Sequence, residues 1–142
     1  MYRGHTVGVV IPAYNEEPFV RETIETVPAF VDRIYVIDDA STDGTWAEIT
    51  AAATAERDRA SGRGHGDGVP GPDRFDRRIV PIQHERNRGV GGAIKTGYLR
   101  AIDDEIDVTA VMGGDGQMRP EALELIVEPV ATGWAEYAKG NR

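Results

Sequence analysis

The chain has 142 residues, of which 40% are hydrophobic, and a formal net charge of -8. This length supports one domain with a buried core and is too short for two ordinary domains. The acidic excess argues against nucleic acid as a partner, because a phosphate backbone attracts basic surfaces, and the absence of cysteine excludes disulfides and thiolate metal sites.

No apolar run approaches the roughly 20 residues that a membrane-spanning helix needs. Residues 1–8 also lack the apolar core of a signal peptide. We therefore expect a cytoplasmic protein, or one at the cytoplasmic face of a membrane in a longer form. Any metal must be held by oxygen atoms or by the three histidines, and oxygen ligands favour Mg²⁺ or Mn²⁺.

Short apolar runs alternate with amphipathic ones along the chain, which predicts strands that alternate with helices. This order indicates an α/β fold with a mostly parallel sheet flanked by helices. The first helix is predicted to bury Phe19, Val20, Ile24 and Val27 on one face. The predicted elements are strands at residues 6–11, 31–37, 78–83 and 108–112, helices at 17–27, 42–57, 89–104 and 121–131, and a last extended piece at 135–138.

Local signals mark the ends of several elements. Ser41 or Thr42 is predicted to cap the second helix, with Asp43 in its first turn, where the helix dipole favours a negative charge. Pro120 is predicted to open the last helix. Residues 58–77 are rich in glycine and proline, so we expect a flexible inserted surface loop. They are not a phosphate cradle, because no strand leads directly into them.

Polar and acidic side chains follow three of the predicted strands. Residues 12–16 read Pro-Ala-Tyr-Asn-Glu, residues 38–45 read Asp-Asp-Ala-Ser-Thr-Asp-Gly-Thr, and residues 114–117 read Gly-Asp-Gly-Gln. In an open parallel sheet, ligands bind beyond the carboxyl ends of the strands, so these strings describe one site. Acids gathered there indicate a bound cation, and a cation in turn indicates a diphosphate.

The first string has two interpretations. Pro12 is predicted to end its strand by removing an amide donor, which leaves Tyr14, Asn15 and Glu16 to contact a base or a ribose. Alternatively, Asn15 and Glu16 only cap the following helix.

A fourth string, Asn-Arg-Gly-Val-Gly-Gly at residues 87–92, joins the third strand to the third helix. Gly89 lets the backbone approach a ligand, and Arg88 and Lys95 are placed to meet negative charge. Tight packing of the helix on the sheet is a compatible alternative. The glycine spacing does not fit a dinucleotide-binding fingerprint, which would need glycine at Ile94.

These four strings, in this order, resemble those of the family 2 glycosyltransferases, most closely the polyprenyl-phosphate (dolichyl-phosphate) mannose and glucose synthase branch. The resemblance covers essentially the whole chain. It implies a Rossmann-like, A-type glycosyltransferase fold and a UDP- or GDP-sugar donor. It also implies Mg²⁺ or Mn²⁺ as cofactor and inverting transfer of the sugar to an acceptor, such as a polyprenyl or dolichyl phosphate at a membrane surface.

The resemblance also implies roles for single residues. Either Asp38 or Asp39 accepts a hydrogen bond from the base or ribose. Asp43 is predicted to be structural from its own position at the start of the second helix. Asp115 is the catalytic residue and holds the metal with Gln117. Gly113 stands where relatives usually carry the first acid of an Asp-x-Asp string, so we expect the metal to enter mainly with the nucleotide. The implied nucleotide-binding residues are Pro12, Ala13, Tyr14, Asn15, Glu16, Asp38, Asp39, Gly89, Lys95, Gly114 and Asp115.

Residues 114–116 have an alternative interpretation, in which they form a Gly-Asp-Gly turn that binds no ligand.

At the end of the chain, residues 137–142 resemble a family segment whose Gly-x-Arg string brings the guanidinium of Arg142 toward phosphate. We assign Arg88 to the same phosphate or acceptor side. The family's domain continues further. We therefore expect residues 1–142 to be its nucleotide-sugar-binding part, with the acceptor-binding half absent.

Two other functions are open. A non-catalytic nucleotide-sugar-binding module, or inactive fragment, would bind the donor without turnover. A sugar nucleotidyltransferase would need a glycine-rich, basic loop after the first strand, where this chain has Ala-Tyr-Asn-Glu at residues 13–16.

Overall fold

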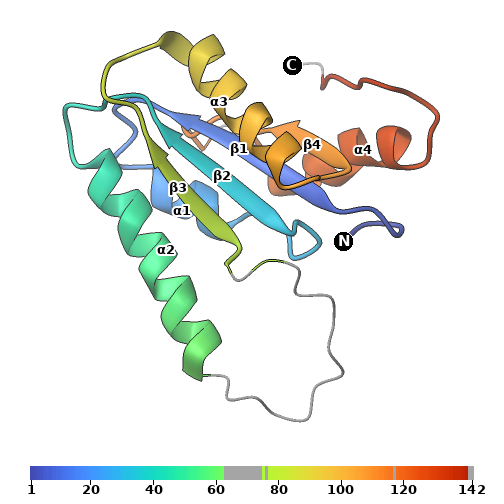
Figure 1. The fold of residues 1–142 in the computed structure, drawn as a ribbon, viewed down its shortest axis with the longest axis horizontal. Coiled ribbons are helices and arrows are strands. Elements are labelled where there is room, and N and C mark those ends of the chain that lie inside the picture. Colours follow the sequence, from blue (N-terminus) through green and yellow to red (C-terminus); the bar gives the residue numbers. More distant parts are fainter. Residues whose placement is uncertain (63–74, 76, 117, 141–142) are drawn as a thin grey trace.

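The computed structural model describes residues 1–62, 75, 77–116 and 118–140. Strands and helices alternate from the first element to the last (Figure 1). They are β1 (Val7–Ala13), α1 (Val20–Glu25), β2 (Arg33–Asp38), α2 (Thr45–Gly62), β3 (Ile79–Gln83), α3 (Gly89–Asp103), β4 (Val108–Val111) and α4 (Pro120–Ala131).

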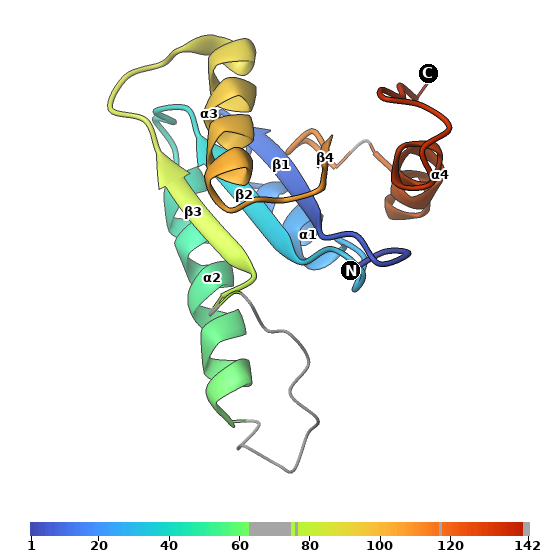
Figure 2. The same ribbon diagram turned by 45° about the vertical axis from the view of Figure 1, so that its right-hand side comes forward.

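The four strands form one sheet in the order β3-β2-β1-β4, and each neighbouring pair is parallel. The predicted α/β fold is thus confirmed. The strands all point the same way (Figure 2), so their carboxyl ends share one edge of the sheet, which we call the carboxyl edge.

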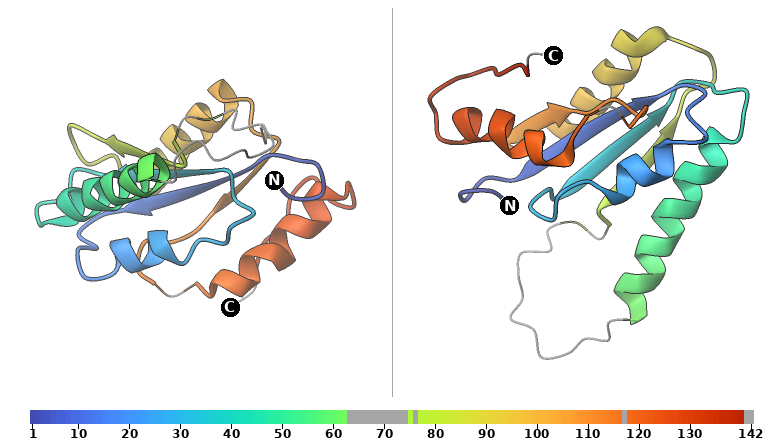
Figure 3. Two further views of the ribbon diagram at one scale, coloured as in Figure 1. Left: turned by 90° about the horizontal axis from the view of Figure 1, so that it is seen from below. Right: turned by 180° about the vertical axis from the view of Figure 1, so that it is seen from behind.

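Helices cover both faces of the sheet (Figure 3). Successive side chains of β1 point to opposite faces. Val7, Val9 and Ile11 pack with residues of α1, α2 and α4, whereas Val10 packs with residues of α3. Only α3 therefore separates one face from solvent, among the helices that the structure describes.

The prediction that Pro12 ends β1 is wrong. The strand continues to Ala13, and Pro12 stays in register with Ile37 of β2. The carbonyl of Ala13 accepts the amide of Asp39 on the β2 side, while that of Val10 accepts the amide of Met112 on the β4 side. By alternation the missing N–H of Pro12 faces β4, whose pairing with β1 has already ended, so no ladder hydrogen bond is lost.

The first two helices begin later than predicted. The first, α1, spans only Val20–Glu25, and Phe19 is 48% exposed rather than buried. The second begins at Thr45, not at residue 42, and its first amide is capped by the Asp43 carboxylate (Thr45 N to Oδ1, 2.9 Å). Ser41 and Thr42 are drawn away from the helix because they bond to Asn15.

The structure also changes two predictions, the loop at residues 58–77 and the extended piece at residues 135–138. Because α2 continues to Gly62, residues 58–62 of the predicted loop are helical; residues 63–74 and 76 lie outside the described part of the chain. Residues 135–138 are not assigned to a strand. The proline at the start of α4 is confirmed.

An ionic cluster lies at the edge of the sheet opposite the carboxyl edge. Arg33 Nη2 lies 2.9 Å from Asp104 Oδ2, and the Tyr35 hydroxyl donates to the same oxygen at 2.7 Å. Burial would raise the pKa of Asp104, but these hydrogen bonds and the Arg33 charge outweigh it and hold the pKa below its ordinary value. The cluster fastens the first residues of β2 to the end of α3.

Gly97 sets how closely α3 approaches the sheet. A Cβ atom there would lie 2.3 Å from Cγ1 and 2.7 Å from Cγ2 of Val10, which is fully buried. The glycine therefore lets the middle of α3 rest directly on β1.

We predict that Gly97→Ala lowers the free energy of unfolding by about 1–3 kcal/mol, because Val10 cannot move away from the added methyl group. Gly91→Ala is the matched control, since it lies in the same helix with nothing within 4 Å of an added Cβ. It should be neutral or stabilise by about 0.5–1 kcal/mol. Urea unfolding measures both, and equal effects of the two variants would contradict the argument.

Candidate functional site

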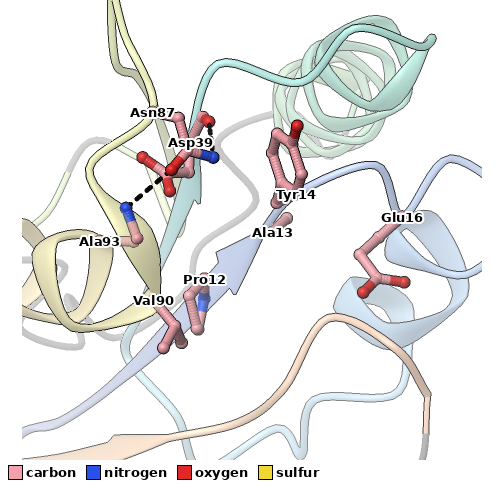
Figure 4. Close-up of a pocket in the computed structure, with 9 residues that line it drawn as sticks. Pro12, Ala13, Tyr14, Glu16, Asp39, Asn87, Val90 and Ala93 are labelled. Atoms are coloured by element: carbon pink, nitrogen blue, oxygen red, sulfur yellow. Dashed lines mark hydrogen bonds between the residues drawn. The ribbon is translucent and has the colours of Figure 1, made fainter.

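A cavity of about 420 Å³ lies at the carboxyl edge, where the ends of β1 and β2 meet the segment that enters α3 (Figure 4). Three of the four strings found in the sequence contribute to its wall, and the described residues of the string at 114–117 do not. The residues that line it are Pro12, Ala13, Tyr14, Glu16, Asp39, Asn87, Gly89, Val90 and Ala93.

Of the two adjacent acids after β2, Asp39 lines the cavity and Asp38 does not. Asp38 is fully buried. One of its carboxylate oxygens accepts the amide of Ser41 and the other accepts the side chain of Gln83, both at 3.2 Å. Asp38 therefore ties the end of β2 to that of β3, and of the two acids Asp39 is the one that faces the cavity.

The Asp39 carboxylate is held by several donors. Its Oδ1 lies 2.8 Å from His84 Nδ1 and accepts the amide of Arg88 at 2.8 Å. Burial would raise the pKa of Asp39, but the hydrogen bonds from His84 and from the amides of Arg88 and Gly89 outweigh it, so the pKa lies below its ordinary value. Asp39 is thus ionised at neutral pH, at the wall of the cavity.

Asn15 plays a part that the sequence did not indicate. It is not among the residues that line the cavity, and its backbone has a positive φ of 51°. Its amide donates to Ser41 Oγ at 2.9 Å, and its Oδ1 accepts the amide of Thr42 at 2.8 Å. Asn15 therefore joins the loop after β1 to the loop after β2.

The alternative that Asn15 and Glu16 only cap α1 does not hold. The residue at the N-cap position is Phe19, with no side-chain capping hydrogen bond. The Glu16 carbonyl does accept the amides of Phe19 and Val20 where α1 begins. Its amide donates to Thr45 Oγ1 at 2.9 Å, and Glu16 also lines the cavity (Figure 4), so capping is not its only role.

The string after β4 lies at the same edge. A Cβ atom on Gly114 would lie 3.1 Å from the Pro12 carbonyl oxygen and 3.4 Å from Ala13 Cβ, so this loop packs against the end of β1. The pKa of Glu16 is raised by burial and then by the negative charges of Asp115 and Asp43. Glu16 and Asp115 are thus close enough to repel each other, although Asp115 does not line the cavity itself.

The carboxylates of Asp115 and Glu16 are the kind of oxygen ligand that Mg²⁺ and Mn²⁺ accept. Within residues 1–62, 75, 77–116 and 118–140, no group of three or more His, Cys, Asp or Glu side chains could hold a metal ion. Mg²⁺ commonly keeps several waters and uses one or two carboxylates with substrate phosphates. The donor set therefore fits a cation that arrives with a diphosphate, and does not fit a tight site in the protein alone.

Two predicted site residues, Gln117 and Arg142, lie outside the described residues. Lys95 lies on α3 and Arg88 immediately before it, and neither lines the cavity. Asn87, Val90 and Ala93 line the cavity but were not predicted as site residues, although they lie within or next to the glycine-rich string. His84 was not predicted either; it follows directly after β3 and so reaches the carboxyl edge.

A comparison with protein families decides the classification. The model of the family described as Glycosyl transferase family 2 matches residues 8–142. The chain belongs to glycosyl transferase family 2.

Curated relatives of this family 2 member include two that are named for polyprenyl-linked transfer. One is the UDP-N-acetylglucosamine–dolichyl-phosphate N-acetylglucosaminyltransferase of Methanococcus voltae, 27% identical over 96% of this chain and 51% of the relative. Another is the polyprenol monophosphomannose synthase of Mycolicibacterium smegmatis, 28% identical over 94% of this chain and 44% of the relative. The chain thus spans about half the length of these relatives.

Solved structures support the A-type glycosyltransferase fold. A mannosyltransferase from Pyrobaculum calidifontis, in complex with GDP-Man and Mn²⁺, superposes with a TM-score of 0.60 at 21% identity over 84% of this chain and 30% of that one. Glucosyl-3-phosphoglycerate synthase from Mycobacterium tuberculosis, with Mn²⁺, UDP and phosphoglyceric acid, also gives 0.60 at 21% identity, over 91% of this chain and 40% of that one. Among the helices that the structure describes, none combines the length and the apolar composition of a membrane span.

We predict that Glu16→Gln stabilises the protein at neutral pH by roughly 0.2–1 kcal/mol, because it removes a partly buried charge and then its repulsion from Asp115 and Asp43. The pKa of Glu16 is higher in the folded state than its ordinary value of 4.5, so ionised Glu16 costs stability above the folded pKa. The difference between variant and wild type should therefore shrink as the pH falls toward 4.5.

Urea unfolding at pH 7.5 and pH 4.5 measures this difference. Glu85→Gln removes an exposed carboxylate and serves as the control, for which we expect little change at either pH. If the free energy of unfolding of Glu16→Gln exceeded that of wild type by the same amount at both pH values, the assigned cost of the Glu16 charge would be contradicted.

Proposed function

We propose that residues 1–142 form the donor-binding part of a metal-dependent, inverting glycosyltransferase. It would transfer a sugar from a UDP- or GDP-sugar to a polyprenyl or dolichyl phosphate at a membrane surface. The observation that carries the proposal is the carboxyl-edge cavity, which joins an ionised Asp39, a half-exposed Tyr14 and the glycine-rich entry to α3. The names of the polyprenyl-linked relatives support the choice of acceptor.

Asp39 is the group that fits a nucleobase. An ionised carboxylate only accepts hydrogen bonds, and the imide N–H of uracil or the N–H groups of guanine are donors. Its two oxygens offer about four acceptor positions, so the hydrogen bonds that it already accepts leave capacity for a ligand. Tyr14, 47% exposed at the rim, offers an aromatic face for the base or ribose.

The diphosphate belongs near the start of α3 and the Asp115 loop. Gly89 has a positive φ of 77° and lines the cavity, so the backbone there can approach a phosphate closely. Asp115 would hold the cation, with Glu16 beside it. A bound divalent cation would offset the negative charge that develops on the leaving nucleoside diphosphate.

The reaction is a displacement at the anomeric carbon. An oxygen of the acceptor phosphate forms the new bond to this carbon, and the bond to the diphosphate breaks with its electron pair leaving on the diphosphate. The acceptor is already an anion, so no side chain must remove a proton. The protein's own contribution in this chain is to bind and orient the donor through Asp39, Tyr14 and the α3 entry.

One observation favours a second candidate, a module that binds nucleotide-sugars without turnover. The carboxylates near Asp115 form no complete metal site among the residues that the structure describes. A metal bound weakly at this edge would allow donor binding yet limit catalysis.

Thermal denaturation with UDP, GDP and their sugars, with and without Mn²⁺, tests the proposal. A ligand at about 100 times its Kd stabilises a protein by about 2.7 kcal/mol. We expect stabilisation by nucleotide that grows when Mn²⁺ is added, and little effect of Mn²⁺ alone. Asp115→Asn should remove the part that depends on Mn²⁺, whereas Asp39→Asn should weaken binding with or without it.

Asp103→Asn is the control, because it removes an exposed carboxylate at the far end of α3. Failure of every nucleotide to stabilise the wild-type protein would contradict the proposal. Nucleotide binding without transfer of labelled sugar to undecaprenyl phosphate would favour the binding module.

A further inference from the structure

His84 is a buried polar residue that takes no part in the cavity wall. It is 6% exposed, and both ring nitrogens have partners. Nδ1 lies 2.8 Å from Asp39 Oδ1, and Nε2 lies 2.8 Å from the hydroxyl oxygen of Thr96, on the second turn of α3. The Thr96 hydroxyl in turn donates to the Gly92 carbonyl at 3.1 Å. These contacts form a continuous chain from the cavity into α3.

The contacts of the ring fix the position of one proton. An ionised Asp39 has no hydrogen to give, so His84 Nδ1 must donate to it. On the other side of the ring, the Thr96 hydroxyl lies within hydrogen-bond distance of both Nε2 and the Gly92 carbonyl.

The neighbours of the ring agree with this assignment. Asp39 is bonded to it directly, and the backbone carbonyl of Asp38 accepts the His84 amide at 2.9 Å. Arg88 meets the same carboxylate oxygen through its amide. The neighbour from α3 is the neutral hydroxyl of Thr96. Among these neighbours, the charged group that contacts the ring is the Asp39 carboxylate, which accepts from Nδ1.

We propose that His84, which donates from Nδ1, is a positioning residue that orients the Asp39 carboxylate for the nucleobase and links that orientation to α3. The proposal rests on the proposed function, because it assigns the residue that prepares its base-binding group. His84 itself does not touch the ligand. It acts by fixing Oδ1 of Asp39, so that the carboxylate does not have to be ordered when the nucleotide binds.

Two substitutions separate positioning from packing. His84→Asn keeps a side-chain N–H in place of Nδ1–H but loses the ring. His84→Phe keeps a ring of similar size but cannot donate. If His84 orients Asp39, His84→Phe should weaken binding of UDP or GDP about tenfold or more, and His84→Asn should stay within about threefold of wild type. If His84 only fills space, the order of the two variants should reverse.

Calorimetric titration with UDP and with GDP, each in the presence of Mn²⁺, measures the affinities, and thermal denaturation checks that both variants fold. Nitrogen NMR of the empty wild-type protein supplies a second readout that requires no ligand. We expect the His84 ring, assigned by its absence from the His84→Asn spectrum, to show a proton on Nδ1.

An Nδ1 without a proton in that spectrum, or equal affinities of the two variants, would overturn the inference. If Nδ1 carries a proton but neither nucleotide binds the wild-type protein, the proposed function fails and the positioning role fails with it. Wild-type binding that both variants retain unchanged would contradict the positioning role alone.

Discussion

The carboxyl edge depends on one buried acid. The amide of Asp39 donates to the carbonyl of Ala13 at the end of β1, and its carboxylate bonds to His84 after β3 and to the amide of Arg88 before α3. Its backbone carbonyl also accepts the side chain of Asn87 at 3.3 Å (Figure 4). Three segments that are distant in sequence, the ends of β1 and β2 and the loop from His84 to Arg88, are therefore joined at one residue. A buried charge is costly unless it is paired and hydrogen-bonded, so the loops must close around it in this arrangement.

The rest of the fold carries these loops to the same place. Because every strand pair is parallel, the segments after β1, β2, β3 and β4 all emerge at one edge. Gly97 holds α3 close to β1, which brings Gly89, Val90 and Ala93 to the cavity. Gly114 allows the last loop to pack on Pro12 and Ala13, and this contact brings the charge of Asp115 toward Glu16.

The sequence was most informative where a pattern has one physical cause. Runs of apolar residues predicted all four strands to within a few residues, and the position of the strings at strand ends predicted that they meet at one edge. Element boundaries were harder to predict, because they depend on tertiary contacts. Pro12 stays in β1 since β4 has already ended beside it, and α2 starts late since Ser41 and Thr42 bond to Asn15.

The choice between Asp38 and Asp39 also lay beyond the sequence. Adjacent residues point to opposite sides, and only the fold shows that Gln83 and Ser41 occupy the first acid. His84 was overlooked for a similar reason. A single histidine outside any recognisable string has no pattern, and its meaning comes entirely from Asp39 and Thr96, which are 45 and 12 residues away in the chain.

The ionic cluster of Arg33, Tyr35 and Asp104 lies at the end of the sheet away from the cavity. Its attachment of β2 to α3 does not involve any side chain that faces the cavity. During evolution, substitutions that adapt the cavity to a new ligand would leave these ionic contacts intact. Residues such as Tyr14 and Val90 can therefore change without loss of the stability that the ionic cluster contributes.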